Sequence, residues 1–258
     1  MKIKKWTSVF LLSILSTGVN LTQAQVINTD RPDQTESSST VPARSLQIES
    51  GILVGFSEGS TFSERQILAP TNLLRFGLFR FAEIRMLSQV EHFKSISNNK
   101  EQLGISDFEI GTKIQLFRKA ESKTEVAILS HLVIPSGSTT LTNGTEGVIS
   151  KLSVSHALTE DLGIGYNLGY NYFGVGSGDL TYSLALGYSL SDKVGIYIEP
   201  HGELNNMKTY ISNFDAGFTY LFSDLIQADF SFGTGLNHKM NYVSIGLSCL
   251  FVRESANQ

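Results

Sequence analysis

The chain has little charge, little proline and almost no cysteine. Its 258 residues include 20 Lys and Arg, 24 Asp and Glu, 5 Pro and one Cys. The single cysteine, Cys249, excludes an intrachain disulfide and a cysteine-based metal cluster. The net charge of −4 gives no electrostatic basis for binding nucleic acid. The charged share of 17% is below the roughly 25% of ordinary soluble domains, so an ordinary soluble surface is not expected.

Long hydrophobic runs and catalytic signatures are also missing. No run after the first 25 residues reaches the ~18 apolar residues of a membrane-spanning helix. The sequence has no nucleophile elbow, phosphate loop or dinucleotide fingerprint. We therefore predict that the protein is not an enzyme and uses no cofactor or metal. Any role in a membrane must be performed by strands.

The first 24 residues have the three parts of a secretory signal peptide. Three lysines, an apolar run from Trp6 to Leu15 and a small-residue site ending at Ala24 follow one another, so Gln25 is the predicted first mature residue. Residues 25–44 are polar and without period, and are predicted to be a periplasmic lead-in or a plug. Residues 45–252 are the predicted barrel, and residues 253–258 a C-terminal tail.

Alternating side chains dominate the chain after residue 45. In the stretch 162–173, LGIGYNLGYNYF, every second residue is Leu, Ile or Tyr, and five of the other six are Gly or Asn. Successive side chains of an extended strand point to opposite faces, so this pattern indicates a strand with one apolar and one small, polar face. We count about twelve such strands, at residues 46–56, 74–78, 84–90, 108–116, 126–134, 148–158, 162–173, 180–188, 194–198, 210–220, 226–232 and 243–251.

The predicted connections alternate between short and long. Tight turns are expected at residues 80–82, 119–123, 159–161, 191–193 and 223–224, and mostly longer loops at 57–70, 94–104, 136–147, 174–178, 204–208 and 237–240. Short periplasmic turns and longer extracellular loops are typical of outer-membrane barrels. The predicted fold is therefore an all-β, antiparallel transmembrane barrel of about twelve strands, with both termini periplasmic.

The apolar face is expected to point outward. A soluble β-sandwich or a lipocalin-like exported barrel would need to bury aromatic residues from nearly every strand, whereas a membrane barrel presents them to lipid. The predicted location is the outer membrane of a Gram-negative bacterium. The predicted partners are outer-membrane lipid, the barrel-assembly machinery and a small-molecule solute, with no nucleic acid.

The opposite face carries most of the charged residues of the strands. Two interpretations stay open: these residues line a pore that selects solutes by charge and width, or they form a mixed-sign network that pairs with itself. The candidates are Glu49, Arg75, Glu83, Arg85, Glu91, Glu109, Lys113, Glu125, His131, Lys151, Glu199, Asp215 and Asp229.

The polar lead-in is the most specific stretch of the sequence. It reads TDRPDQTES from Thr29 to Ser37, followed by Val41-Pro42 and by LQIESG from Leu46 to Gly51. This order resembles the opening of a family of outer-membrane transporters named for the MetA pathway of phenol degradation. The motif residues are Thr29, Asp30, Arg31, Pro32, Asp33, Thr35 and Glu36.

The resemblance implies an outer-membrane barrel that transports small molecules, in some relatives aromatic or other hydrophobic compounds. It does not fix the cargo, and it supplies no catalytic residue. It also favours a plug, in which acidic residues of the lead-in pair with Arg75, Arg85 or Lys113. The alternative is a flexible periplasmic tail.

The predicted function is passive passage of small molecules, because no energy source is visible in the chain. One alternative is a structural or adhesin-like barrel without transport. Another is a barrel phospholipase that uses His156, which falls on the apolar face near Ser130 and Ser150 in the pattern. A histidine near a strand end is more often an interfacial residue, and no acidic residue stands where it would orient His156.

Overall fold

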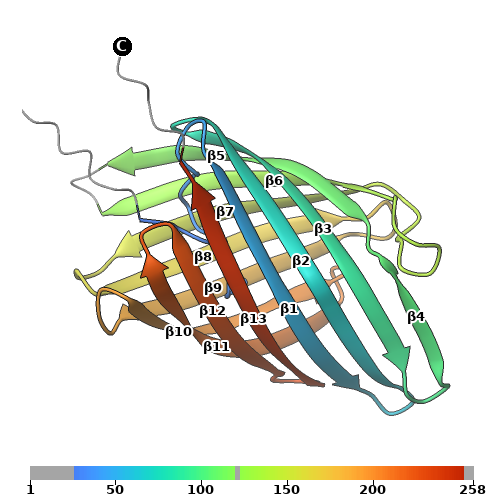
Figure 1. Cartoon of the computed structure of the whole chain (residues 1–258). Coiled ribbons are helices and arrows are strands. Elements are labelled where there is room, and N and C mark those ends of the chain that lie inside the picture. The colour runs from blue at the N-terminus through green and yellow to red at the C-terminus, as the bar shows by residue number, and fades with distance from the viewer. Residues whose placement is uncertain (1–25, 120–122, 253–258) are drawn as a thin grey trace, which may run out of the picture.

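A computed structural model describes residues 26–119 and 123–252 of the chain (Figure 1). The predicted signal peptide and C-terminal tail lie outside the described residues. Within them, no helix has the length and apolar character needed to cross a membrane.

The described chain is built from strands. Their bounds are β1 Leu46–Glu58, β2 Ser63–Phe79, β3 Ala82–Ser95, β4 Lys100–Ile105, β5 Phe108–Lys119, β6 Thr124–Ile134, β7 Gly147–Ala157, β8 Leu162–Tyr172, β9 Asp179–Ser189, β10 Val194–Asn205, β11 Thr209–Ser223, β12 Ile226–Gly235 and β13 Lys239–Phe251.

The strands form one closed antiparallel sheet. Apart from β4 and β5, which do not pair with each other, consecutive strands pair along the chain, and β1 closes the ring by pairing with β13, from Leu46 opposite Phe251 to Glu58 opposite Lys239. Strands β4 and β5 share one position, because β4 pairs with one end of β3 and β5 with the other. The predicted barrel of twelve strands is therefore confirmed, with one position divided between two segments.

The two faces of the wall differ as the alternation predicts. Large apolar side chains are exposed on the outside, among them Leu168 at 55% and Ile245 at 58%. Charged side chains on the other face are buried, for example Glu83 at 0% and Arg75 at 1%. An apolar exterior and a polar interior suit lipid outside and a polar lumen inside, and the closed ladder leaves no sheet edge in the lipid.

Two of the predicted long loops are wrong in extent. Residues 57–70 contain the first half of β2, and residues 94–104 contain the end of β3 and most of β4. In β2 the pairing register shifts between Leu68 and Thr71, at Ala69-Pro70. A bulge reverses which parity faces outward, so a single alternating pattern does not run through it. At the end of the barrel where β1 joins β2 and β3 joins β4, the strands β2, β3 and β4 project further than their neighbours (Figure 1).

Candidate functional site

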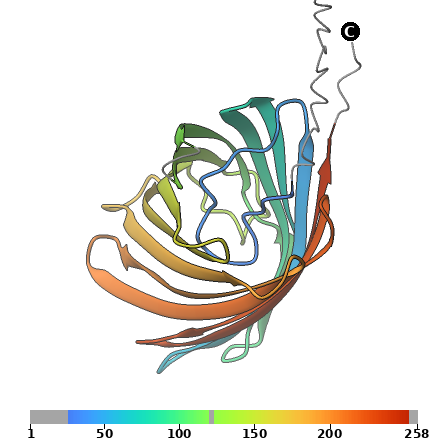
Figure 2. The ribbon, with the colours of Figure 1, turned by 90° about the vertical axis from the view of Figure 1, so that its left-hand side faces the viewer.

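A loop of the N-terminal segment fills part of the barrel interior. Residues 26–44 contain no strand, and Figure 2 shows this segment folded inside the ring of strands. We call residues 28–39 the lumen loop. The two ends of the loop meet, because Asn28 Nδ2 donates to Ser39 Oγ at 2.8 Å. Arg75 of β2 joins the same two ends by donating to the carbonyl oxygens of Asn28 and Ser39, each at 3.0 Å.

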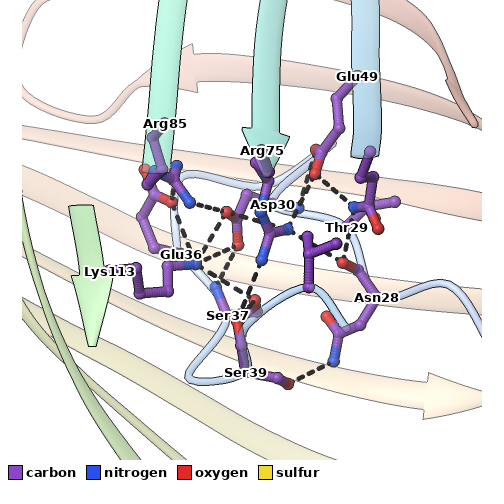
Figure 3. Close-up of polar contacts among 12 residues, drawn as sticks. Asn28, Thr29, Asp30, Glu36, Ser37, Ser39, Glu49, Arg75, Arg85 and Lys113 are labelled. Atoms are coloured by element: carbon purple, nitrogen blue, oxygen red, sulfur yellow. Dashed lines mark hydrogen bonds and ion pairs between the residues drawn. The ribbon is translucent and has the colours of Figure 1, made fainter. Parts of the chain in front are cut away.

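Asp30 is the central anion of the lumen loop. Its carboxylate lies 3.2 Å from Arg75 Nη1 and 2.8 Å from Lys113 Nζ, and it also accepts a hydrogen bond from Arg85 (Figure 3). Burial by itself would raise the pKa of this carboxyl, but the three surrounding cations outweigh it and hold the pKa well below its usual value. Asp30 is therefore ionised, and three strands of the wall bind it at once.

The cations around Asp30 are themselves held by further carboxylates, of the wall and of the loop. Arg75 lies 2.9 Å from Glu49, and Arg85 lies 2.7 Å from Glu36 of the loop (Figure 3). Arg75 also lies 2.8 Å from Glu83. Buried charges cost several kcal/mol each to desolvate, so removal of a single member leaves its partners uncompensated. We call the wall formed by β1, β2, β3 and β5 around Asp30 the charged wall.

The tip of the lumen loop, residues 33–36, contacts the side of the barrel opposite the charged wall. The backbone N–H of Gln34 donates to Glu199 of β10 at 2.7 Å, and the hydroxyl of Thr35 donates to the same carboxylate. The N–H of Glu36 donates to Asn167 Oδ1 of β8 at 2.7 Å. We call this side, formed by β8, β9 and β10, the tip wall. The loop thus extends across the lumen from one wall to the other.

Asp33 stands near the tip with a different environment from Asp30. Burial, and next the negative charge of Glu199, raise the pKa of the Asp33 carboxyl well above its usual value. The pKa values of these two aspartates, three residues apart in one motif, are therefore shifted in opposite directions. Burial raises the pKa of both carboxyls, and the difference comes from the facing wall, which adds cations at Asp30 and a carboxylate at Asp33.

Arg31 is fixed by a third contact, with β12 and β13. Its guanidinium lies 3.1 Å from Asp229 Oδ1 and donates to Ser244 Oγ at 2.9 Å. It rests on two glycines, Gly51 and Gly246, which pair with each other across β1 and β13. A β-carbon at Gly51 would come within 2.5 Å of the guanidinium, and one at Gly246 would also overlap it. Only glycine leaves the space that Arg31 occupies.

Two polar cavities lie against the lumen loop. One, of about 320 Å³, is lined by Gln34 of the loop and by residues of β7 to β11 toward the ends of these strands expected to be extracellular. The other, of about 550 Å³, is lined by Asp33, Thr35 and Glu36 and by residues of the turn between β7 and β8. The loop tip therefore separates the two cavities.

The remaining predicted lumen residues also have partners. Glu91 accepts from Gln66 at 2.7 Å, and Glu109 lies 2.7 Å from His131. The other contacts of this set join Glu125 to Arg118, Lys151 to Glu36, and Asp215 to Tyr242. The structure thus brings six of the thirteen candidates around Asp30, directly or through a neighbour: Glu49, Arg75, Glu83, Arg85, Lys113 and His131. That any of them select a solute stays a prediction.

His156 has partners that do not form a catalytic arrangement. Its Nδ1 lies 2.9 Å from Thr124 Oγ1 and its Nε2 lies 3.2 Å from the hydroxyl of Tyr166. Ser130 and Ser150, the two serines considered with it, lie 3.2 Å from each other.

Several residues of the site do not emerge from the charge pattern. Asn167 and Ser183 contact the tip but are uncharged, and nothing in a single strand marks them. Gly51 has a signal, because it ends the LQIESG part of the opening motif. A glycine at this position of the motif, read as a place where another group approaches the backbone closely, is the signal that could have identified the place of Arg31.

The closed antiparallel sheet, apolar outer face and polar interior define a transmembrane β-barrel of the outer-membrane type. The model of one family matches residues 29–251 and is described as "Putative MetA-pathway of phenol degradation". The chain belongs to this family, as the opening motif predicts.

Solved structures of the same fold include an outer membrane channel from Pseudomonas putida F1. It is 12% identical, with a TM-score of 0.74, and the alignment covers 87% of this chain and 100% of that one. The KdgM porin in complex with disordered oligogalacturonate is 12% identical, with a TM-score of 0.54 over 81% of this chain and 99% of that one. At these identities the likeness establishes the fold. A comparison with curated protein sequences gives no match.

Proposed function

We propose that this protein is a passive outer-membrane channel for small molecules, closed by its own lumen loop. The observation that carries the proposal is the loop tip between two polar cavities, one toward each end of the barrel. A solute that crosses the lumen along β7 to β11 must pass the loop tip, residues 33–36. In the proposed mechanism the solute gradient alone drives passage, so passage is downhill.

The contacts of the tip support a closure that can open. The tip is held by hydrogen bonds, including those to Glu199 and Asn167, and each typically contributes only about 0.5–1.5 kcal/mol net, or about 1.5–3 with a charged partner. Water can replace these hydrogen bonds when the tip moves, and the ion pair of Glu36 with Arg85 is a further contact that must break. The neck of the loop, where Asn28 and Ser39 meet, is held far more firmly, by Arg75 and the buried carboxylates that pair with it.

Deletion of residues 26–40 tests the proposal. We expect the single-channel conductance of the deletion variant in planar lipid bilayers to exceed that of the full mature chain, and swelling of liposomes with sugars to speed up. Thr35→Val, which keeps the shape of the side chain and removes its hydrogen bonds to Glu199 and Ser183, should give a smaller increase in the same direction.

A matched control is Arg118→Ala, which removes an ion pair with Glu125 whose arginine side chain is 58% exposed. It should leave conductance and swelling unchanged. An unchanged conductance on deletion of the loop would contradict the closure. Absence of solute flux above empty liposomes, for both the mature chain and the deletion variant, would favour the structural or adhesin-like barrel.

The phospholipase alternative has a separate test. Lipid hydrolysis by the purified barrel, lost in His156→Ala, would support it. The contacts of His156 with Thr124 and Tyr166 favour an interfacial role instead.

A further inference from the structure

The cavity on the extracellular side of the loop tip is lined mainly by uncharged polar side chains. Its volume of about 320 Å³ is at the lower end of the roughly 300–1,000 Å³ of small-molecule sites. The lining comes from five consecutive strands and from the loop tip. It includes the amides of Gln34, Asn167, Asn171 and Asn213 and the hydroxyls of Thr181 and Ser183.

Two of these amides have an unused hydrogen-bonding atom. Asn171 Oδ1 and Asn213 Oδ1 are buried and have no hydrogen-bond partner within the described chain. Asn213 is only 8% exposed. Buried polar atoms normally find a partner, so an unpartnered pair at one cavity indicates that an occupant supplies it. Both atoms accept hydrogen bonds, so the occupant must donate.

The charges at the cavity favour an occupant that is neutral. Lys151 and Glu203 both line it, and their opposite signs cancel. The remaining lining groups are amides and hydroxyls that offer both donors and acceptors. A hydroxyl group of a solute also donates and accepts, so several hydroxyls on one small ring or chain match this lining.

An apolar aromatic solute does not match it. Such a ring carries no group that donates a hydrogen bond, so it would leave the oxygens of Asn171 and Asn213 without partners. The apolar groove of about 910 Å³ in this structure is elsewhere, on the outer face, with Ile52, Ile245 and Leu247 in its lining. Its position on the exterior puts it against lipid tails.

We propose that the cavity binds a neutral polyhydroxylated solute of about monosaccharide size, as the last site before the loop tip. This inference rests on the proposed channel function and names its class of solute. Gln34 forms part of the cavity lining, so a bound solute touches the segment that must move.

The test combines binding and conductance with the full mature chain. Glucose, phenol and the zwitterion glycine are titrated into the detergent-solubilised barrel by calorimetry, and added to single channels in planar bilayers. We expect glucose to bind and to reduce the channel current, with no effect of phenol or glycine. The double variant Asn171→Ala/Asn213→Ala should require at least about tenfold more glucose for the same effect.

Ser231→Ala and Ser248→Ala are matched controls, because these hydroxyls are also buried without a partner but lie outside the cavity. They should leave the glucose titration unchanged. Thr181→Val offers a milder change in the cavity if the double variant does not fold, and it should weaken glucose binding.

The outcomes separate this inference from the proposed function. Solute flux without glucose binding, equal glucose effects in the cavity variants and the controls, or stronger effects of phenol or glycine than of glucose would each overturn the inference and leave the channel in place. Glucose binding that the cavity variants abolish, without flux of any solute, would support the site and contradict the channel.

Discussion

The two walls of the barrel hold the same loop in different ways. The charged wall surrounds Asp30 with three cations that are themselves paired with carboxylates. The tip wall offers Glu199, Asn167 and Ser183, which bind backbone N–H groups and one hydroxyl. The first wall fixes the neck of the loop through mutually dependent charges and also reaches the tip, through the ion pair of Arg85 with Glu36. The second wall holds the tip through bonds that water can replace. The difference indicates a fixed end and a releasable end.

The largest expected effect is at the fixed end. Arg75→Ala removes the guanidinium that joins Asn28 and Ser39 and leaves Asp30, Glu49 and Glu83 without their shared cation. We expect the free energy of unfolding to fall by about 3–5 kcal/mol, as for other broken buried ion pairs. Urea titration in lipid vesicles, followed by far-UV circular dichroism, measures it.

The ion pair of exposed Arg118 with half-buried Glu125 provides the comparison. Arg118→Ala should change the unfolding free energy by less than about 1 kcal/mol, because exposed ion pairs contribute little. Equal losses for the two arginine variants would show that the charged wall does not hold the loop in the way described.

A smaller effect is expected where Arg31 rests on the wall. Gly51→Ala places a methyl group against the guanidinium and should displace it from Asp229. Overpacking of this kind typically costs about 1–3 kcal/mol. Gly55→Ala in the same strand is the control, since its nearest neighbour would be an ordinary 3.6 Å away, at Leu53. The same urea titration compares the two, and a Gly51→Ala variant as stable as Gly55→Ala would remove the argument for the glycine contact.

The smallest expected effect is a pH dependence that differs between the two ends of the loop. The pKa of Asp33 is raised by burial and by Glu199, so the inserted loop favours the protonated form of this carboxyl. Ionisation of Asp33 as the pH rises through its folded pKa should add repulsion from Glu199 at the tip and increase conductance. The pKa of Asp30 is lowered, so the ionised carboxylate stabilises the inserted loop. This stabilisation is fully present above the unperturbed pKa of 3.8 and is lost as the pH falls through the folded pKa.

Conductance should therefore rise in two pH ranges: at high pH through ionisation of Asp33, and at pH well below 3.8 through protonation of Asp30. Asp33→Asn tests the first part, because an amide at this position carries no charge at any pH. This variant should lack the rise at high pH and keep the rise at low pH. An equal rise at high pH in Asp33→Asn and in the wild type would contradict the assignment of Asp33.

Particular elements show how far the sequence predicts the structure. The stretch 162–173 predicts β8 within one residue, because a strand with one apolar face alternates with period two whatever its neighbours are. The first half of β2 was missed, because the bulge at Ala69-Pro70 interrupts that period. The sequence predicts the charged candidates as a set, and the family motif favours pairing of the lead-in with Arg75, Arg85 or Lys113. It does not show that Asp30 is the residue that meets all three cations, since these contacts form only when β2, β3, β5 and the loop are brought together.

The sequence by itself determined the class of protein, the approximate number of strands, the outward face and the family. These properties depend on local alternation and on one linear motif, which are both written along the chain. Only the tertiary structure decided that Asp30 and Asp33 face opposite charge, that Gly51 and Gly246 make room for Arg31, and that the loop tip separates two cavities. Each of these depends on groups brought together across the lumen by closure of the sheet, and the spacing along one strand does not encode which residues will face each other there.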